Sequence, residues 1–156
     1  MAVPPRIRTQ VQVMFFDTDC GGVVSNIAYL RFIEIARTLL AEDLGLALTE
    51  MAGNQRYPVV VRTEIDYRRP AKLGDQLVIE GWLSRVERVR FWCGFRITRP
   101  ADQVLIAQCR QMLALIEMPE GKLLRLPEHW KKYRADDSVE ADSEGGRPIS
   151  GAERIR

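Results

Sequence analysis

Residues 27–44 are predicted to form one long helix with a very broad apolar face, and this helix constrains the fold more than any other segment. At about 100° per residue, the apolar side chains cover roughly half of the helix circumference. They are Ala28, Tyr29, Phe32, Ile33, Ile35, Ala36, Leu39 and Leu40. Gly45 is expected to stop the helix at Asp43 or Leu44. A helix of this kind needs a sheet wrapped around it.

The rest of the chain supplies strands for such a sheet. Alternating apolar and polar residues, bounded by turn residues, predict strands at 7–16, 58–69, 76–86, 89–99, 104–117 and 122–125. In the second strand, one face is predicted to carry Val59, Val61, Thr63, Ile65 and Tyr67. Residues 46–56 are expected to form a loop or a short helical turn. One early helix with several antiparallel strands defines the α+β class.

Length and composition predict one domain without nucleic-acid or membrane partners. The 156 residues suffice for one domain, expected at 1–134, while residues 135–156 are polar and glycine-rich and predict a disordered tail. With 23 Lys and Arg residues against 21 acidic ones, the net charge of +2 gives no reason to expect nucleic acid or an anionic membrane as partner. The start lacks a secretory signal and no run approaches the roughly 20 apolar residues of a bilayer span, so a cytoplasmic location is expected.

Residue types that bind metals are scarce in this chain. The three cysteines, Cys20, Cys93 and Cys109, lack a CxxC spacing, which argues against a disulfide framework and a thiolate zinc site. His129 is the only histidine. The sequence therefore predicts neither a metal ion nor an organic cofactor.

The acidic segment before the helix is the strongest candidate for chemistry. Residues 17–26 read DTDCGGVVSN and run directly into the helix. The first N–H groups of a helix are unpaired and partly positive, so they can polarise a carbonyl while an upstream carboxylate attacks or deprotonates. The same residues also suit an ordinary turn, with Ser25 or Asn26 as helix cap and Gly21 and Gly22 supplying unusual dihedral angles. Composition alone leaves both interpretations open.

Three parts of the sequence carry a resemblance to a known family. They are the acidic segment with the following YL and EIAR at 29–30 and 34–37, residues 65–75 (IDYRRPAKLGD), and residues 124–127 (LRLP). Together they resemble hotdog-fold acyl-CoA thioesterases of the 4-hydroxybenzoyl-CoA thioesterase and YbgC type. The resemblance implies a hotdog fold, a long central helix wrapped by a curved antiparallel sheet of five or six strands. It also implies a homodimer or homotetramer, in which edge-to-edge pairing of sheets covers an exposed strand.

The resemblance further implies roles for single residues. Asp19 takes the place of the family's reactive carboxylate, either as nucleophile toward the thioester or as the base that activates water. Asn26 would supply the first free N–H of the helix. YbgC-type members often have His at this position, so the Asn26 of this chain excludes the imidazole-assisted version of the mechanism. Tyr29 is interpreted as a core residue or an acyl contact, and Arg88 and Arg90 as ligands of the CoA phosphates or a solvated hairpin face.

Two neighbours of Asp19 receive other interpretations. Asp17 is expected to form the turn, so that its substitution should affect folding first. Cys20 would need an activating base to act as a nucleophile, and His129 lies far along the chain beside the predicted tail.

These observations predict an acyl-CoA thioesterase that releases a free carboxylic acid and coenzyme A, with coenzyme A present only as part of the substrate. The acyl group stays open among aromatic, short and long chains. One alternative substrate is an acyl carrier protein thioester, and one alternative function is acyl-CoA binding without turnover. Nucleic-acid binding through Trp82, Trp92 and the hairpin arginines is disfavoured by the near-neutral charge.

Overall fold

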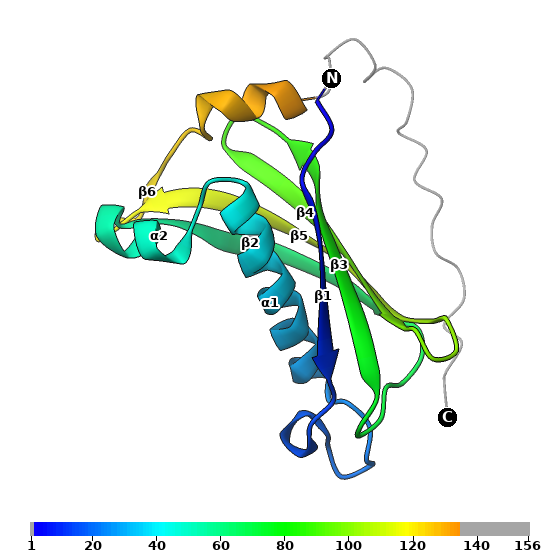
Figure 1. The fold of residues 1–156 in the computed structure, drawn as a ribbon. Coiled ribbons are helices and arrows are strands. Elements are labelled where there is room, and N and C mark those ends of the chain that lie inside the picture. The colour runs from blue at the N-terminus through cyan, green and yellow to red at the C-terminus, as the bar shows by residue number, and fades with distance from the viewer. Residues whose placement is uncertain (1, 135–156) are drawn as a thin grey trace, which may run out of the picture.

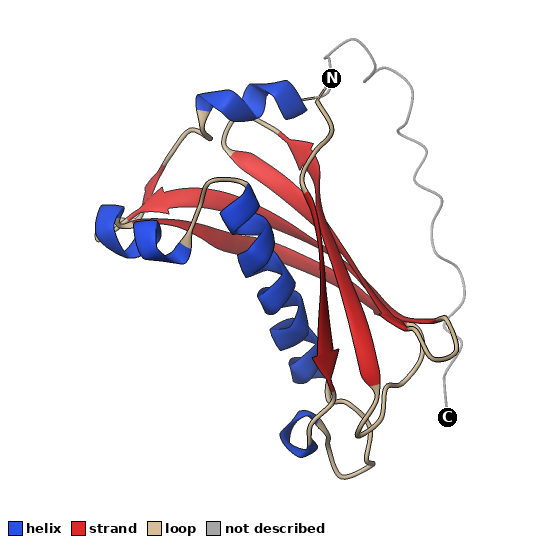
Figure 2. Cartoon of the chain, in the orientation of Figure 1, coloured by secondary structure: helices blue, strands red, loops and turns tan. Residues whose placement is uncertain are grey.

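The computed structural model describes residues 2–134, in which a curled antiparallel sheet packs against one long helix, α1 (Figures 1 and 2). In chain order the elements are β1 (Arg6–Gln12), η1 (Phe15–Asp17), α1 (Asn26–Asp43), α2 (Leu48–Asn54), β2 (Arg56–Tyr67), β3 (Gln76–Val86), β4 (Arg90–Arg99), β5 (Val104–Glu117), β6 (Lys122–Leu123) and η2 (Glu128–Tyr133). The strand order is β1-β3-β4-β5-β2, with β6 paired to β5. The predicted α+β architecture is confirmed. The predicted tail lies outside the described residues.

The helix and most strands begin and end close to the predicted positions. α1 ends at Asp43, and Gly45 follows with a φ of 84°, a conformation that favours glycine at the end of a helix. The first strand is shorter than the predicted 7–16 range, because the chain leaves the sheet after Gln12 and coils into the 3₁₀ helix η1. Residues 46–56 contain a short helix, α2.

The predicted face of β2 is wrong at its N-terminal half because the strand contains a bulge. The register slips between Val60 and Arg62, so that Val60 pairs with Leu113 and Arg62 with Met112. Val61 is the extra residue. An extra residue reverses the alternation, so Val59 lies on the sheet face opposite to the one that carries the residues from Thr63 onward.

The core lies between α1 and the sheet, and η2 closes one end of it. The buried residues of α1 are Ala28, Tyr29, Phe32, Ile33, Ala36, Leu40 and Ala41. They pack with fully buried side chains of the central strands, including Leu77 and Ile79 of β3 and Ile97 of β4. From η2, the Trp130 indole N–H donates to the Leu44 carbonyl at 3.1 Å, and the Trp130 ring meets Phe91 edge to face. Leu39, expected on the apolar face, is 37% exposed.

The two outer strands of the sheet, β1 and β2, each have an open edge. Both β1 and β2 pair on one side only. None of the β2 residues is buried, and Val61 at the bulge is 52% exposed. An open strand with exposed apolar side chains favours pairing with another chain. Among residues 2–134, no helix has both the length and the apolar character needed to cross a bilayer.

Candidate functional site

The N-terminus of α1 presents two unpaired backbone donors. Ser25 is the helix cap, and its Oγ accepts a hydrogen bond from the Ala28 N–H at 3.3 Å. Within residues 2–134, no acceptor meets the N–H groups of Asn26 and Ile27. Both of these residues are exposed. The two donors can therefore meet an oxygen atom of a bound ligand.

The acidic loop, residues 17–25, folds back on itself in front of this helix end. Thr18 and Val24 form an antiparallel bridge. One step closer to the helix, the Ser25 N–H donates to the Asp17 carbonyl at 2.9 Å. The two ends of the loop are thus paired in the manner of a short hairpin, and its base is joined to the helix cap.

Asp19 lies at the exposed tip of the acidic loop. Its Oδ1 accepts a hydrogen bond from the Gly21 N–H at 2.9 Å, and its main-chain N–H donates to the Val23 carbonyl at 3.0 Å. The Gly22 N–H donates to the Asp19 carbonyl, and the φ of 70° at Gly22 explains the glycine there. Within the described chain, Asp19 Oδ2 accepts no hydrogen bond, so this oxygen is open to a ligand.

Asp17 has the opposite environment, although it is only two residues away. Its side chain is 1% exposed and forms an ion pair with Arg31 of α1 at 2.5 Å. The second carboxylate oxygen accepts the Met14 N–H at 2.9 Å. Arg31 also lies over the ring of Phe16, 5.5 Å from its centroid. Asp17 therefore joins η1, the acidic loop and α1, as expected for a residue that shapes the turn.

The hairpin pairing determines how far Asp19 lies from the helix donors. Asp17 is opposite Ser25, next to the helix start, and Asp19 is two residues farther toward the tip. Two residues of extended chain span about 7 Å. A reacting carbonyl group needs about this much room, since a nucleophile approaches carbon at roughly 3–3.5 Å and the oxygen accepts hydrogen bonds at roughly 3 Å.

Two tyrosines support the helix start from the sheet side. The Tyr29 hydroxyl accepts the Ala71 N–H at 3.1 Å, and burial raises the pKa of Tyr29 above its ordinary value. Its ring lies 5.4 Å from that of Tyr67, whose hydroxyl donates to the Asn26 carbonyl at 3.5 Å. Tyr29 is 4% exposed. In the single chain, Tyr29 thus faces the core and the loop before β3.

The structure of one chain does not bring Arg88 and Arg90 to the acidic loop. The loop contacts the turn before β3, through a bridge between Val23 and Lys72, whereas both arginines follow the other end of β3. The 11 residues of β3 span about 36 Å at 3.3 Å per residue. Both arginines are exposed. Their interpretation as phosphate ligands stays a prediction.

Other side chains that adjoin the site were not singled out from the sequence. Lys72 is exposed and lies beside the acidic loop through its bridge to Val23. Ile27, Phe15 and Phe16 are 79%, 81% and 76% exposed, which makes the surface around the helix start strongly apolar. Only Lys72 lies within one of the motifs, residues 65–75, and the exposure of the three apolar side chains cannot be read from residue type alone. Among residues 2–134, no group of three or more His, Cys, Asp or Glu side chains is placed to hold a metal ion.

Comparisons with known proteins point to one family. The sequence pattern of the Thioesterase-like superfamily matches residues 13–133. The chain is 31% identical to acyl-CoA thioesterase YbgC of Haemophilus influenzae, over 78% of this chain and 88% of the other. It is 30% identical to 1,4-dihydroxy-2-naphthoyl-CoA hydrolase of Synechocystis, over 80% and 91%. The crystal structure of a probable thioesterase from Bartonella henselae has a TM-score of 0.73 at 31% identity, covering 79% of this chain and all of that one. The predicted resemblance and the hotdog fold are confirmed.

Proposed function

Because this chain belongs to the Thioesterase-like superfamily, we propose that it hydrolyses an acyl-CoA thioester to a carboxylic acid and coenzyme A, with Asp19 as the reactive carboxylate. The observation that carries this proposal is that one hairpin-like loop, whose base is joined to the cap of α1, presents an Asp19 oxygen without a hydrogen-bond partner, Oδ2, and that the start of α1 presents two unpaired N–H groups. In the described chain, neither Asp19 Oδ2 nor the N–H groups of Asn26 and Ile27 form another hydrogen bond. The proposed reaction requires no metal ion and no organic cofactor.

The helix start would stabilise the negative charge that develops on the thioester oxygen. In the proposed pose, the N–H groups of Asn26 and Ile27 donate to this oxygen, and the partial positive charge of the helix end adds to the effect. Loss of one such donor typically raises a barrier by about 2.7–4 kcal/mol. The Asn26 side chain is free to hold water or substrate.

Asp19 can act in two ways, and both give the same products, the carboxylic acid and coenzyme A. As a nucleophile, its oxygen adds to the carbonyl carbon, the carbon–sulfur bond breaks, and the mixed anhydride is then hydrolysed by water. As a general base, it removes a proton from a water molecule that adds to the same carbon, and the coenzyme A thiolate leaves. In both cases the free Oδ2 atom is the one that reacts.

The substrate class follows from the relatives. One is named an acyl-CoA thioesterase and another a hydrolase of an aromatic CoA ester, so we infer an acyl-CoA substrate with an aliphatic or aromatic acyl group. The exposed apolar residues around the helix start, among them Phe15 and Ile27, favour an apolar acyl group. Tyr29, buried in the first turn of α1, would support this apolar surface.

We also infer that the active form is a homodimer or homotetramer located in the cytoplasm. The open edge of β2, with no buried residue, favours pairing with the same strand of a second copy. Assembly also offers a role for Arg88 and Arg90. Since they lie a whole strand away from the acidic loop of their own chain, they would bind coenzyme A at a site to which another protomer contributes Asp19.

The test measures thiol release from a panel of aliphatic and aromatic acyl-CoA esters, with acyl carrier protein thioesters included. Asp19→Asn should lower kcat at least about 100-fold while the melting temperature stays unchanged. Cys20→Ala, at the neighbouring exposed position, is the matched control and should keep wild-type kcat. Full activity in Asp19→Asn would remove this residue from the mechanism. Binding of acyl-CoA without turnover by the wild type would favour the non-catalytic alternative.

A further inference from the structure

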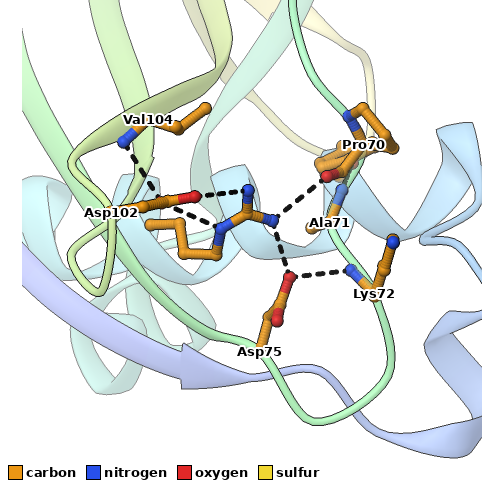
Figure 3. Close-up of polar contacts among 8 residues, drawn as sticks. Pro70, Ala71, Lys72, Asp75, Asp102 and Val104 are labelled. Carbon is orange, nitrogen blue, oxygen red and sulfur yellow. Dashed lines mark hydrogen bonds and ion pairs between the residues drawn. The ribbon is translucent and has the colours of Figure 1, made fainter.

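Arg99, at the end of β4, joins two loops that are separate in the sequence. Its Nε and Nη2 donate to the two carboxylate oxygens of Asp102, at 3.0 and 2.9 Å. Its Nη1 donates to Asp75 at 2.9 Å and to the Pro70 carbonyl at 3.3 Å. Figure 3 shows Asp102 on one side of the guanidinium and Asp75 and Pro70 on the other. The side chain is only 20% exposed.

Every donor group of this guanidinium thus has a partner, which fixes its orientation. A planar guanidinium can hold a carboxylate with two hydrogen bonds and still donate elsewhere, which an ammonium group cannot do with the same geometry. The two carboxylates raise the pKa of Arg99, and Arg99 in turn lowers the pKa of Asp102. The ion pairs therefore favour the charged state of the cluster.

Arg99 acts on the loop that precedes β3, residues 70–75. Asp75 Oδ2, which accepts the bond from Arg99, also accepts the Lys72 N–H at 2.9 Å, as Figure 3 shows. The Asp75 N–H donates to the Lys72 carbonyl at 3.0 Å. The turn is therefore held at the Pro70 carbonyl and at Asp75, on both sides of Ala71.

This turn is the surface on which the acidic loop rests. The Ala71 carbonyl accepts the Val24 N–H at 2.8 Å, while its N–H donates to Tyr29 in the first turn of α1. Val23 forms a bridge with Lys72, and the Val23 carbonyl accepts the Asp19 N–H at 3.0 Å. Two hydrogen bonds in series, joined through the neighbouring residues Val24 and Val23, thus connect the turn with Asp19, and one hydrogen bond connects it with α1.

We propose that Arg99 is a positioning residue for the thioester hydrolysis proposed above, on which this inference rests. By fixing residues 70–75, it sets the distance between the Asp19 carboxylate and the N–H groups at the start of α1. It does not touch the substrate itself. Since a displacement of about 1 Å in a reacting geometry can lower a rate about 100-fold, a side chain remote in sequence controls the rate of the chemical step.

The first arm of the test compares kinetics. Arg99→Gln should lower kcat about 10- to 100-fold with little change in KM, because ground-state binding of the substrate uses other groups. Arg99→Lys should retain part of the activity, since an ammonium can pair with one carboxylate at a time. Arg110→Gln is the matched control. Arg110 also forms an ion pair, with Glu64 on the neighbouring strand, but it has no contact with the acidic loop. It should keep wild-type kcat.

The second arm measures the loop directly. Cys20 is exposed at the tip of the acidic loop, next to Asp19, while the other two cysteines are buried. A nitroxide attached to Cys20 should show a more mobile spectrum in Arg99→Gln than in wild type or Arg110→Gln.

The outcomes separate the two proposals. An unchanged spectrum and unchanged kcat in Arg99→Gln would overturn the positioning role. A lower kcat with an unchanged spectrum would overturn it as well, because the loop would not be the link. If the wild type hydrolyses no thioester, the proposed function fails, and the label spectrum still decides whether Arg99 holds the loop. If Arg99→Gln unfolds, Asp102→Asn replaces it, because that variant weakens the contact and keeps the arginine.

Discussion

The ion pair between Asp17 and Arg31 provides the sharpest test of how the acidic loop is held. The proposed cycle uses Asp17→Asn, Arg31→Gln and the double variant. Asparagine keeps an oxygen that can accept the Met14 N–H, while its NH2 group replaces the oxygen that accepts from Arg31, so Asp17→Asn removes the charge pair and keeps the bond to Met14. Arg31→Gln leaves the carboxylate in place without its cation. The cycle therefore isolates the energy of the charge pair.

The expected magnitude follows from the different exposure of the two partners. Asp17 is 1% exposed, whereas the Arg31 side chain is 48% exposed. Pairs at the surface contribute about 0.2–1 kcal/mol, and removal of one partner of a buried pair costs about 3–5 kcal/mol. With one buried and one half-exposed partner, we expect a coupling energy of about 1–2 kcal/mol. Arg31→Gln alone should cost about 2–3 kcal/mol, because it leaves a buried carboxylate with one remaining hydrogen-bond donor.

Urea unfolding at one fixed protein concentration measures these free energies, since the stability of an oligomer depends on concentration. The exposed pair of Arg110 and Glu64 is the matched control, and its coupling should be smaller and should fall as salt is added. The coupling of Asp17 and Arg31 should respond less to salt. A coupling near zero, or one as salt-sensitive as the control, would refute the view that a buried charge anchors the loop.

Three further predictions concern the helix cap, the thiols and the outer face of the sheet. Ser25→Ala should destabilise the protein by about 1 kcal/mol, measured by urea unfolding, because the first turn loses its cap. Ellman's reagent should modify only Cys20 in the folded protein at pH 8, because burial raises the pKa of the cysteines in β4 and β5 to about 12; all three should react in denaturant. Gly94→Ala should cost about 1–3 kcal/mol, since a Cβ there would lie 2.5 Å from the Trp82 ring; a melting temperature equal to that of wild type would contradict it.

The sequence predicted the elements well because local pattern and tertiary packing agree over most of the chain. The strand predictions at 76–86 and 104–117 match β3 and β5, in which alternating residues face the core. The prediction failed where one residue breaks the pattern. The bulge at Val61 has no local signal such as glycine or proline, so the apolar run of β2 gave no indication of the reversed face.

The site was predictable only where its residues are close in sequence. The helix start and Asp19 follow from one short motif, since a cap and a turn depend on local geometry. The contact of Arg99 with Asp75 joins residues 24 positions apart through two loops, and no periodicity indicates it. The separation of Arg88 from the acidic loop depends on the direction of β3, which the strand order determines and residue types do not.

The different tasks of Asp17 and Asp19 explain why stability and activity should respond to different substitutions. Both are carboxylates in the same loop, yet one is buried among donors and the other keeps an open oxygen. A carboxylate that is already satisfied by a cation and an N–H is a weak nucleophile, so the anchoring of Asp17 excludes it from the proposed reaction. The same anchoring holds the hairpin that presents Asp19. The loop therefore needs an anchored carboxylate at its base, Asp17, and a carboxylate with an unpaired oxygen at its tip, Asp19. A single aspartate could not meet both requirements.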